Sequence, residues 1–276
     1  MPALAVLASL ALQNAGAAVA KSLFPLVGPA GVAALRVGIA ALLLLALWRP
    51  WRIDLSRTAL AWLIAYGVAL GLMNLIIYLA FQRIPIGIAV AIEVTGPLAV
   101  VLLGSRRPLD FAWAALAIVG LLLLTPLAAA LSVSGALDPL GVVLALAAAL
   151  CWALYIMFGK RVSALLPSGP AVAIGMAIAA LLTVPLGIAT AGAALIAPEI
   201  LAAGAAVALA SSAIPYSVEM AALRRLPQRA FGIVVASGPA LAALAGWLLL
   251  GETLTALQAA AIACIITAAL GGAASR

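Results

Sequence analysis

The sequence predicts an all-α membrane protein of ten transmembrane helices, built as two inverted five-helix repeats with both termini in the cytoplasm. Of its 276 residues, 68% are hydrophobic and only 8% are charged, which is too few to cover the surface of a soluble domain. The uncharged stretches are about 20 residues long, which matches a hydrocarbon core of roughly 30 Å at 1.5 Å rise per residue. They are continuous rather than alternating, which argues against a transmembrane barrel.

Proline, glycine and charged residues divide the chain into apolar segments, each of which we expect to form one helix. Residues 1–20 end in Ala-Ala-Val-Ala but lack a basic region before the apolar run, so we expect them to be retained rather than cleaved as a signal peptide. The segments are 2–22, 29–48, 58–81, 85–103, 111–127, 139–158, 170–190, 200–222, 228–250 and 253–271.

The basic residues predict the orientation. Cytoplasmic loops of membrane proteins are enriched in Lys and Arg, and with the N-terminus inside, 11 of the 14 basic residues fall on the cytoplasmic side. An odd number of helices would break this alternation. The 11 residues are Arg49, Arg52, Arg57, Arg106, Arg107, Lys160, Arg161, Arg224, Arg225, Arg229 and Arg276.

An internal repeat has an offset of 142 residues. Arg-Ile-Pro at 83–85 and Gly-Pro at 96–97 recur as Arg-Leu-Pro at 225–227 and Gly-Pro at 238–239, and Asp110 falls opposite Glu252. Loops that are basic in one copy are poor in basic residues in the other, so matched loops lie on opposite sides of the membrane. We therefore expect two inverted repeats, residues 1–133 and 134–276, with a substrate site between them, as in many secondary transporters.

Several functional classes are disfavoured. The basic residues are scattered in short loops, so we expect no nucleic-acid partner. The chain has no histidine, and Cys151 and Cys264 lie inside apolar segments, so we expect no metal site. It has no phosphate-binding loop, nucleophile elbow or cofactor fingerprint, so we expect neither a cofactor nor an enzymatic activity.

Glu93 is the polar residue that most strongly indicates function. It lies eight residues after Pro85, about 12 Å into its helix and close to mid-membrane. Its sequence neighbours offer no opposite charge, and ionisable groups inside a membrane are costly unless they have a role. We predict that Glu93 exchanges protons or binds a substrate ammonium group. The alternative is a neutral acid hydrogen-bonded to a neighbouring helix.

Glu219 allows two interpretations. Arg224 and Arg225 follow within two turns, so Glu219 could extend toward the cytoplasmic interface and pair with them. Tyr216 lies three residues earlier on the same helix face, so both could instead belong to a polar site with the same role as that of Glu93.

Arg36 and Lys21 are candidates for binding a substrate carboxylate. Arg36 lies about two turns into the second segment, and its guanidinium suits bidentate contact with a carboxylate. Lys21 closes the first segment, where an interfacial anchor is the alternative interpretation.

Other polar and aromatic residues could together line an aqueous cavity, although each alone is more often an interhelical hydrogen bond or an interfacial residue. Prolines 25, 97, 215 and 239 could mark helix breaks, with tolerated kinks as the alternative. The expected lining residues are Gln13, Asn14, Asn74, Tyr78, Trp152, Tyr155 and Tyr216.

The sequence resembles the EamA-type branch of the drug/metabolite transporter superfamily, and more closely the bacterial threonine/homoserine exporters. The resemblance runs along essentially the whole chain. It implies a ten-helix, two-repeat protein of the bacterial inner membrane. Relatives commonly carry Glu before the proline of helix nine, where this chain has Gly238. The matching stretches are AKSLFPLVG (20–28), GIAVAIEVTGPLAV (87–100), SRRPLDFAW (105–113), CWALYI (151–156), IPYSVEMAAL (214–223) and LGETLT (250–255).

The resemblance also implies a secondary transporter that exports a neutral amino acid such as threonine or homoserine, by antiport against inward proton flow. Its partners would then be the amino-acid substrate, protons and membrane lipid. The alternatives are an exporter of the same fold with another cargo, such as a drug or other metabolite, and an intramembrane scaffold without transport activity.

Overall fold

A computed structural model describes residues 2–84, 86–105, 107–124, 138–241, 244 and 255–274, and these residues form helices and no β-strand. The predicted all-α class is therefore confirmed, and the helices follow the expected apolar segments wherever they are described. The α-helices are α1 (Pro2–Trp48), α2 (Arg57–Phe81), α3 (Ile86–Glu93), α4 (Thr95–Gly104), α5 (Pro108–Leu124), α7 (Pro139–Leu165), α8 (Ser168–Ala191), α9 (Pro198–Ala208), α10 (Ile214–Arg225), α11 (Gln228–Val235) and α13 (Ala256–Ala274).

Helix α1 contains two of the expected segments, separated by a break at Gly28. This residue has φ 66° and ψ 167°, a backbone conformation that residues with a side chain rarely adopt. Pro25 and Pro29 flank it and lack the N–H groups that would continue the helical ladder. The chain therefore reverses direction within a few residues and forms a hairpin.

Three further segments are irregular next to a proline. The segment expected at 85–103 is divided into α3 and α4 at Val94, because Pro97 has no N–H to donate to the carbonyl of Glu93. The segment expected at 200–222 contains a π-helical turn, Leu209–Ala213, immediately before Pro215. The α-helix in the segment expected at 228–250 is interrupted at Ala236 and Ser237, just before Pro239. Breaks are thus confirmed near all four of the expected prolines, and π-helical turns are frequent at functional sites.

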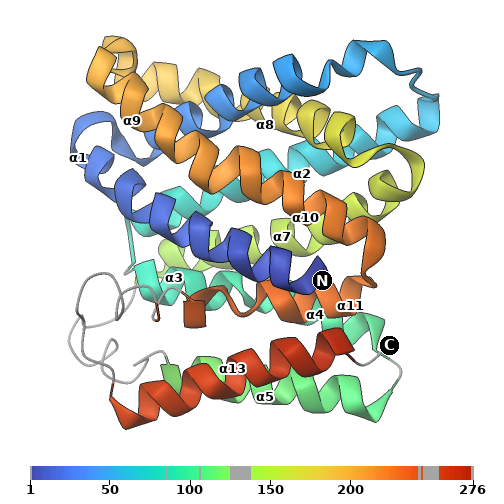
Figure 1. Cartoon of the computed structure of the whole chain (residues 1–276). Helices are drawn as coiled ribbons and strands as arrows, with labels where there is room; N and C mark the ends of the chain where they lie inside the picture. The colour runs from blue at the N-terminus through green and yellow to red at the C-terminus, as the bar shows by residue number, and fades with distance from the viewer. Residues whose placement is uncertain are drawn as a thin grey trace.

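The helices lie side by side in a bundle, with α5 and α13 paired at one edge and α8 packed against α1 and α2 at the other (Figure 1). Between these edges, α4 packs on both α7 and α11, while α10 contacts α1, α7 and α8. Helices from the two halves of the sequence are therefore interleaved, and the centre of the bundle is lined by both.

The lateral surface is strongly apolar, with Leu103 85% exposed and Leu181 75% exposed. Such a surface is unusual for a soluble protein and suits contact with lipid. Five helical segments are long and apolar enough to cross a bilayer, and four shorter apolar helices accompany them within the described parts of the chain. The expected segment 228–250 is described only up to residue 241 and at residue 244.

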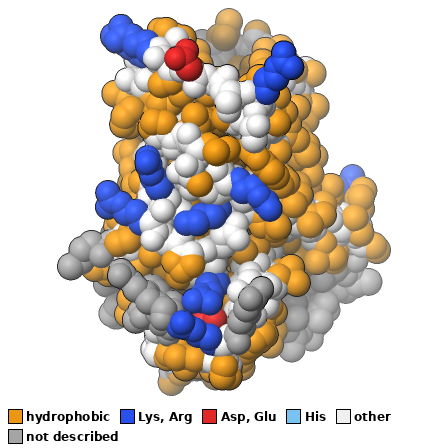
Figure 2. All heavy atoms as spheres, turned by 90° about the vertical axis from the view of Figure 1, so that its right-hand side faces the viewer, with side chains coloured by type: hydrophobic (Ala, Val, Ile, Leu, Met, Phe, Trp, Pro, Cys, Tyr) orange, Lys and Arg blue, Asp and Glu red, His pale blue; other side chains and the backbone are white. Residues whose placement is uncertain are grey.

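Basic side chains gather on the face at one end of the bundle (Figure 2). On this face α2 begins at Arg57, α10 ends with Arg224 and Arg225, and α11 begins beside Arg229. Arg229 forms an ion pair of 3.3 Å with Asp110, which is buried in the first turn of α5. The first residues of α1 and the last of α13 lie at the same end (Figure 1).

A second ion pair lies at the opposite helix ends. Arg83, after α2, donates a hydrogen bond of 3.0 Å to Asp138, which caps α7 and also accepts from the N–H of Leu140. These hydrogen bonds lower the pKa of Asp138 below its ordinary value. Of the stretch expected to link the two repeats, 128–138, only Asp138 is among the described residues.

Close helix packing depends on glycine at several contacts, and the two Gly-Pro pairs differ in this respect. A Cβ atom at Gly96 would overlap the carbonyl oxygen of Ala149, so Gly96 lets α4 touch the backbone of α7. A Cβ atom at Gly238 would meet no atom of the described residues within 4 Å. Small residues at helix interfaces allow close backbone contacts, like that of Gly96, in membrane proteins generally.

We therefore predict that Gly96→Ala lowers the free energy of unfolding by about 1–3 kcal/mol, the usual cost of an extra methyl group in a packed interior. Gly238→Ala is the matched control and should leave the stability unchanged. The measurement is the thermal unfolding midpoint of both variants in the same detergent. Equal midpoints would mean that α4 and α7 separate without cost.

Candidate functional site

A cavity of about 150 Å³ lies in the centre of the bundle. Both halves of the sequence contribute to its wall. The lining residues are Leu10, Gln13, Asn14, Arg36, Met73, Asn74, Ile77, Tyr78, Phe81, Val90, Glu93, Val94, Trp152, Tyr216, Glu219, Gly238 and Pro239.

Most of the residues singled out from the sequence line this cavity. Tyr155 does not line it and lies behind Glu219 instead. The side chain of Lys21 lies outside the described part of the structure. The structure therefore brings together both glutamates, the arginine and the predicted polar lining residues, namely Gln13, Asn14, Arg36, Asn74, Tyr78, Glu93, Trp152, Tyr216 and Glu219.

Arg36 is a buried cation without a carboxylate partner. Its side chain is 7% exposed, and no described acidic oxygen lies within 4.0 Å of the guanidinium. Its Nε atom is buried without a hydrogen-bond partner among the described residues. The guanidinium carbon lies 5.2 Å from the ring centroid of Tyr78, which offers only a cation–π interaction. A guanidinium in this position suits a carboxylate arriving through the cavity.

Glu93 is also buried, at 9% exposure, and ends α3 at the helix break. Its carboxyl group makes no hydrogen bond or ion pair with any described residue. Arg36 is near enough to interact with it electrostatically but not to form an ion pair. The cavity therefore holds a carboxyl group and a guanidinium group that do not form an ion pair with each other.

Glu219 faces the cavity from α10 and is 2% exposed. The hydroxyl of Tyr155 donates a hydrogen bond of 2.8 Å to its Oε2. No ion pair joins Glu219 to Arg224 or Arg225 in the described residues, so the interpretation that extends it toward these arginines is wrong. The polar-site interpretation agrees with its position.

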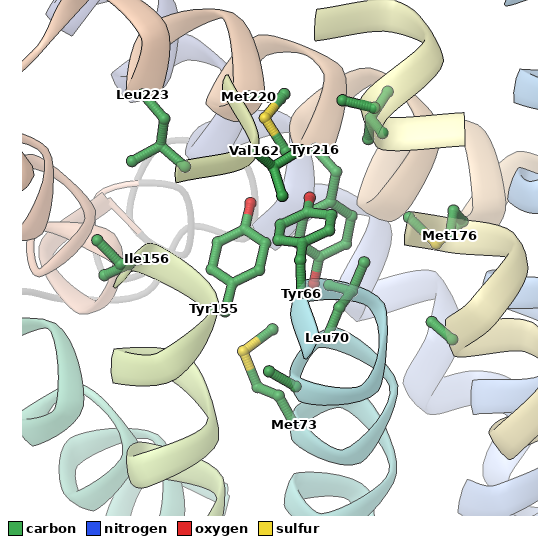
Figure 3. Close-up of a cluster of buried hydrophobic side chains, with 14 of the residues drawn as sticks. Tyr66, Leu70, Met73, Tyr155, Ile156, Val162, Met176, Tyr216, Met220 and Leu223 are labelled. Atoms are coloured by element: carbon green, nitrogen blue, oxygen red, sulfur yellow. The ribbon is translucent and has the colours of Figure 1, made fainter. Parts of the chain in front are cut away.

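Three tyrosines form a cluster in the bundle (Figure 3). Tyr66 from α2, Tyr155 from α7 and Tyr216 from α10 are all buried, with ring centroids 5.2 Å apart for the first pair and 5.8 Å apart for the second. Met220 and Leu223 pack around them on the α10 side (Figure 3). On α2, Tyr66 lies between the cavity-lining residues, which begin at Met73, and the end of the helix at Arg57.

Helix α1 contributes amides that bond backbone carbonyls near the other breaks. Gln13 donates to the carbonyl of Ser211 at 3.4 Å, and Asn14 donates to the carbonyl of Gly238 at 3.3 Å. The Ser211 carbonyl is the group that Pro215 leaves without a helical donor. The two predicted lining residues on α1 thus hold irregular backbone in place.

Sequence reasoning did not identify Tyr66 or the cavity-lining position of Gly238. Tyr66 has no local polar neighbour, so its place beside Tyr155 appears only in the fold. Both Gly96 and Gly238 precede a proline, so the sequence pattern could not distinguish the packed Gly96 from the cavity-lining Gly238.

We predict that Arg36→Met leaves the unfolding midpoint unchanged or raises it, because burying an unpaired ion costs several kcal/mol after relaxation. The lost cation–π interaction offsets only about 0.5–2 kcal/mol of this gain. Arg161→Met is the matched control, since Arg161 is exposed and lies 4.6 Å from the Trp62 ring. The test is thermal unfolding in detergent without substrate. A larger loss of stability in Arg36→Met than in Arg161→Met would make Arg36 a structural residue.

Comparison with known proteins places the chain among transporters. The EamA-like transporter family matches residues 139–271. The threonine/homoserine exporter RhtA of Escherichia coli (strain K12) is 49% identical over 272 residues, covering 98% of this chain and 90% of that protein. RhtA of Salmonella typhimurium (strain LT2) has the same identity and coverage.

A solved structure, described only as a crystal structure of a protein, superposes on the chain with a TM-score of 0.81 at 20% identity, covering 100% of this chain and 99% of the other. This likeness shows the fold alone. The identity to the exporters extends through both halves of the chain, and the apolar helices fit a multi-pass membrane protein. The chain belongs to the EamA-like transporter family and, within it, to the group of the RhtA threonine/homoserine exporters.

Proposed function

We propose that this protein is a secondary transporter that exports threonine, homoserine or a similar small neutral amino acid across the bacterial inner membrane. The observation that carries the proposal is the set of unneutralised charges in one cavity. Among the described residues, Arg36 has no carboxylate partner and Glu93 has no cation in contact. A zwitterion supplies both missing partners in one molecule. The names of the two relatives direct the choice of amino acid.

The substrate carboxylate binds Arg36 and the ammonium binds Glu93. A guanidinium holds a carboxylate through two parallel hydrogen bonds, which fixes the orientation of the bound amino acid. Charge-assisted bonds of this kind are strong in a site with little water. Of the two carboxylate-binding candidates, Arg36 is the one whose side chain is described, and it is buried in the cavity wall.

Proton coupling follows if Glu93 binds either a proton or the ammonium group, but not both at once. A proton taken up from outside displaces the amino acid, and release of that proton inside restores the binding site. Glu219 is the second candidate for this role, but its Oε2 already accepts a hydrogen bond from the Tyr155 hydroxyl. The free carboxylate of Glu93 therefore fits the exchange better.

The size of the cavity favours a small cargo over a drug. Sites for drug-sized ligands usually measure about 300–1,000 Å³, whereas this cavity measures about 150 Å³. A non-transporting scaffold would also gain nothing from a glutamate and an arginine that are buried without an ion-pair partner among the described residues. Gly238 lines the cavity, so relatives that carry Glu at this position would have one more carboxylate there.

The proposed architecture is two inverted repeats, residues 1–133 and 134–276, giving ten spans with both termini in the cytoplasm. Pairs of cavity residues separated by the repeat offset support it, because Leu10 and Trp152 face the same space, as do Asn74 and Tyr216. Substrate sites of inverted-repeat transporters lie at such an interface. The basic face is then the cytoplasmic one.

We expect single cysteines at positions 109 and 251 to be labelled from opposite sides of the membrane, although the repeat makes them equivalent. Position 109, which is exposed at the start of α5, should react from the cytoplasm and position 251 from outside, in a chain whose Cys151 and Cys264 are replaced by alanine. The measurement is protection by a membrane-impermeant maleimide added to intact cells. Cytoplasmic accessibility of both positions would overturn the inverted repeat.

We predict that Glu93→Gln abolishes transport driven by a pH gradient, since glutamine keeps the shape of the side chain but cannot titrate. The measurement is exchange of labelled threonine and homoserine in proteoliposomes, with and without an imposed pH gradient. The wild-type protein should exchange both and respond to the gradient. Glu199→Gln is the control, because Glu199 is exposed at the start of α9, outside the cavity.

The outcomes separate the possible roles of Glu93. Surviving exchange without gradient response assigns proton coupling to it, and loss of both assigns ammonium binding. Wild-type rates and pH dependence in Glu93→Gln would remove Glu93 from the mechanism and favour Glu219. A wild-type protein that exchanges no amino acid but expels lipophilic dyes would replace the proposed function with drug efflux.

A further inference from the structure

The contact between Asn74 and Tyr216 is a neutral polar pair in the cavity wall beside the charged groups. Asn74 on α2 is 1% exposed and Tyr216 on α10 is 3% exposed, and both line the cavity. The Nδ2 of Asn74 donates to the Tyr216 hydroxyl at 3.1 Å and to the Leu70 carbonyl at 2.8 Å. The same hydroxyl lies 3.3 Å from the Oδ1 of Asn74.

This pair lies where the two halves of the chain meet. Asn74 and Tyr216 are 142 residues apart, which is the offset of the sequence repeat. Equivalent residues of two repeats can touch only close to the axis that relates the repeats, and transporters of this design place their substrate there. Tyr216 also interacts electrostatically with Arg36, Glu93 and Glu219. A zwitterion held by the charged groups therefore lies next to the pair.

The pair has hydrogen-bonding capacity to spare. Both hydrogens of the Asn74 amide are used, but its oxygen has two lone pairs and receives only the long contact from Tyr216. The Tyr216 hydroxyl can turn its hydrogen away from Asn74 while still accepting from Nδ2. A ligand hydroxyl placed between them can accept from Tyr216 and donate to Asn74 Oδ1, and every donor is then satisfied.

We propose that Asn74 and Tyr216 form a subsite that recognises the side-chain hydroxyl of the transported amino acid. The proposal rests on the proposed function and specifies its substrate class as hydroxylated amino acids of three or four carbons. The hydroxyl of threonine is on Cβ and that of homoserine is on Cγ, so both lie close to the charged α-carbon substituents. Charge pairing selects any small amino acid, and the subsite selects among them.

The expected selectivity is moderate, because the empty subsite satisfies itself. A site that leaves buried polar groups unpaired rejects a ligand lacking the hydroxyl by a factor of roughly 10⁴ or more. Here Asn74 and Tyr216 bond each other when no hydroxyl arrives, so only the net gain of two exchanged hydrogen bonds remains. Such a gain corresponds to about a tenfold preference.

The experiment compares threonine and homoserine with 2-aminobutyrate, which is the analogue of both without the hydroxyl group. Initial exchange rates are measured for each labelled amino acid in proteoliposomes containing the full chain. The wild-type protein should prefer the hydroxylated substrates about tenfold. Tyr216→Phe keeps the ring that packs on Tyr155 but removes the hydroxyl, so the ratio should fall to within about twofold of one while 2-aminobutyrate is still exchanged.

Tyr66→Phe is the matched control, because it removes another buried phenol hydroxyl from the tyrosine cluster but does not line the cavity. Its ratio should equal that of the wild type. If Tyr216→Phe exchanges no amino acid at all, Asn74→Leu decides, since it removes the other half of the subsite and must also bring the ratio close to one.

Failure of this inference differs from failure of the proposed function. A wild-type protein that exchanges all three amino acids at equal rates, or a Tyr216→Phe protein that keeps the tenfold ratio, would overturn the subsite and leave amino-acid transport intact. A wild-type protein that exchanges none of the three would overturn the transport function itself.

Discussion

The cavity depends on how a chain in lipid satisfies its backbone where proline interrupts a helix. No water is available in the hydrocarbon to bond a released carbonyl, so the protein has to provide a partner or line a cavity there. Pro97 releases the carbonyl of Glu93, and Pro215 releases that of Ser211, which Gln13 then bonds. Gln13, which bonds the Ser211 carbonyl, and Glu93, which lies beside the other break, both line the cavity.

The electrostatics of the site follow from that polar environment. Arg36 and Glu93 do not form an ion pair with each other. The polar cavity, and for Arg36 the Tyr78 ring, lower the free-energy cost of burying these two groups. A direct pair would be more stable, but it would compete with a zwitterion for both charges. Stability is thus sacrificed at the place where the substrate supplies the missing partners, as is common at functional sites.

The fold and much of the candidate site could be predicted from local sequence. Helix segments follow from apolar length, and Glu93 and Arg36 are conspicuous because ionisable groups inside apolar runs are costly. The hydrogen-bond partner of Glu219 could not be predicted, because Tyr155 is on another helix, 64 residues away. The arginines on which the rejected alternative depended are sequence neighbours of Glu219. The division of α3 from α4 was signalled by Pro97, but the packing of Gly96 on Ala149 required the fold.

The difference between the two Gly-Pro pairs has a consequence for how such a protein can change over evolution. Gly96 is fixed by the α4–α7 contact, so a larger residue there has to separate two helices. Gly238 lies 142 residues later in the second Gly-Pro pair and borders the cavity, and a Cβ atom there would meet no atom of the described residues within 4 Å. One Gly-Pro pair is thus a packing element, whereas no described contact excludes a Cβ atom from the glycine of the other. A single codon at position 238 can therefore narrow the cargo range, or add a charge to the cavity, without disturbing the scaffold.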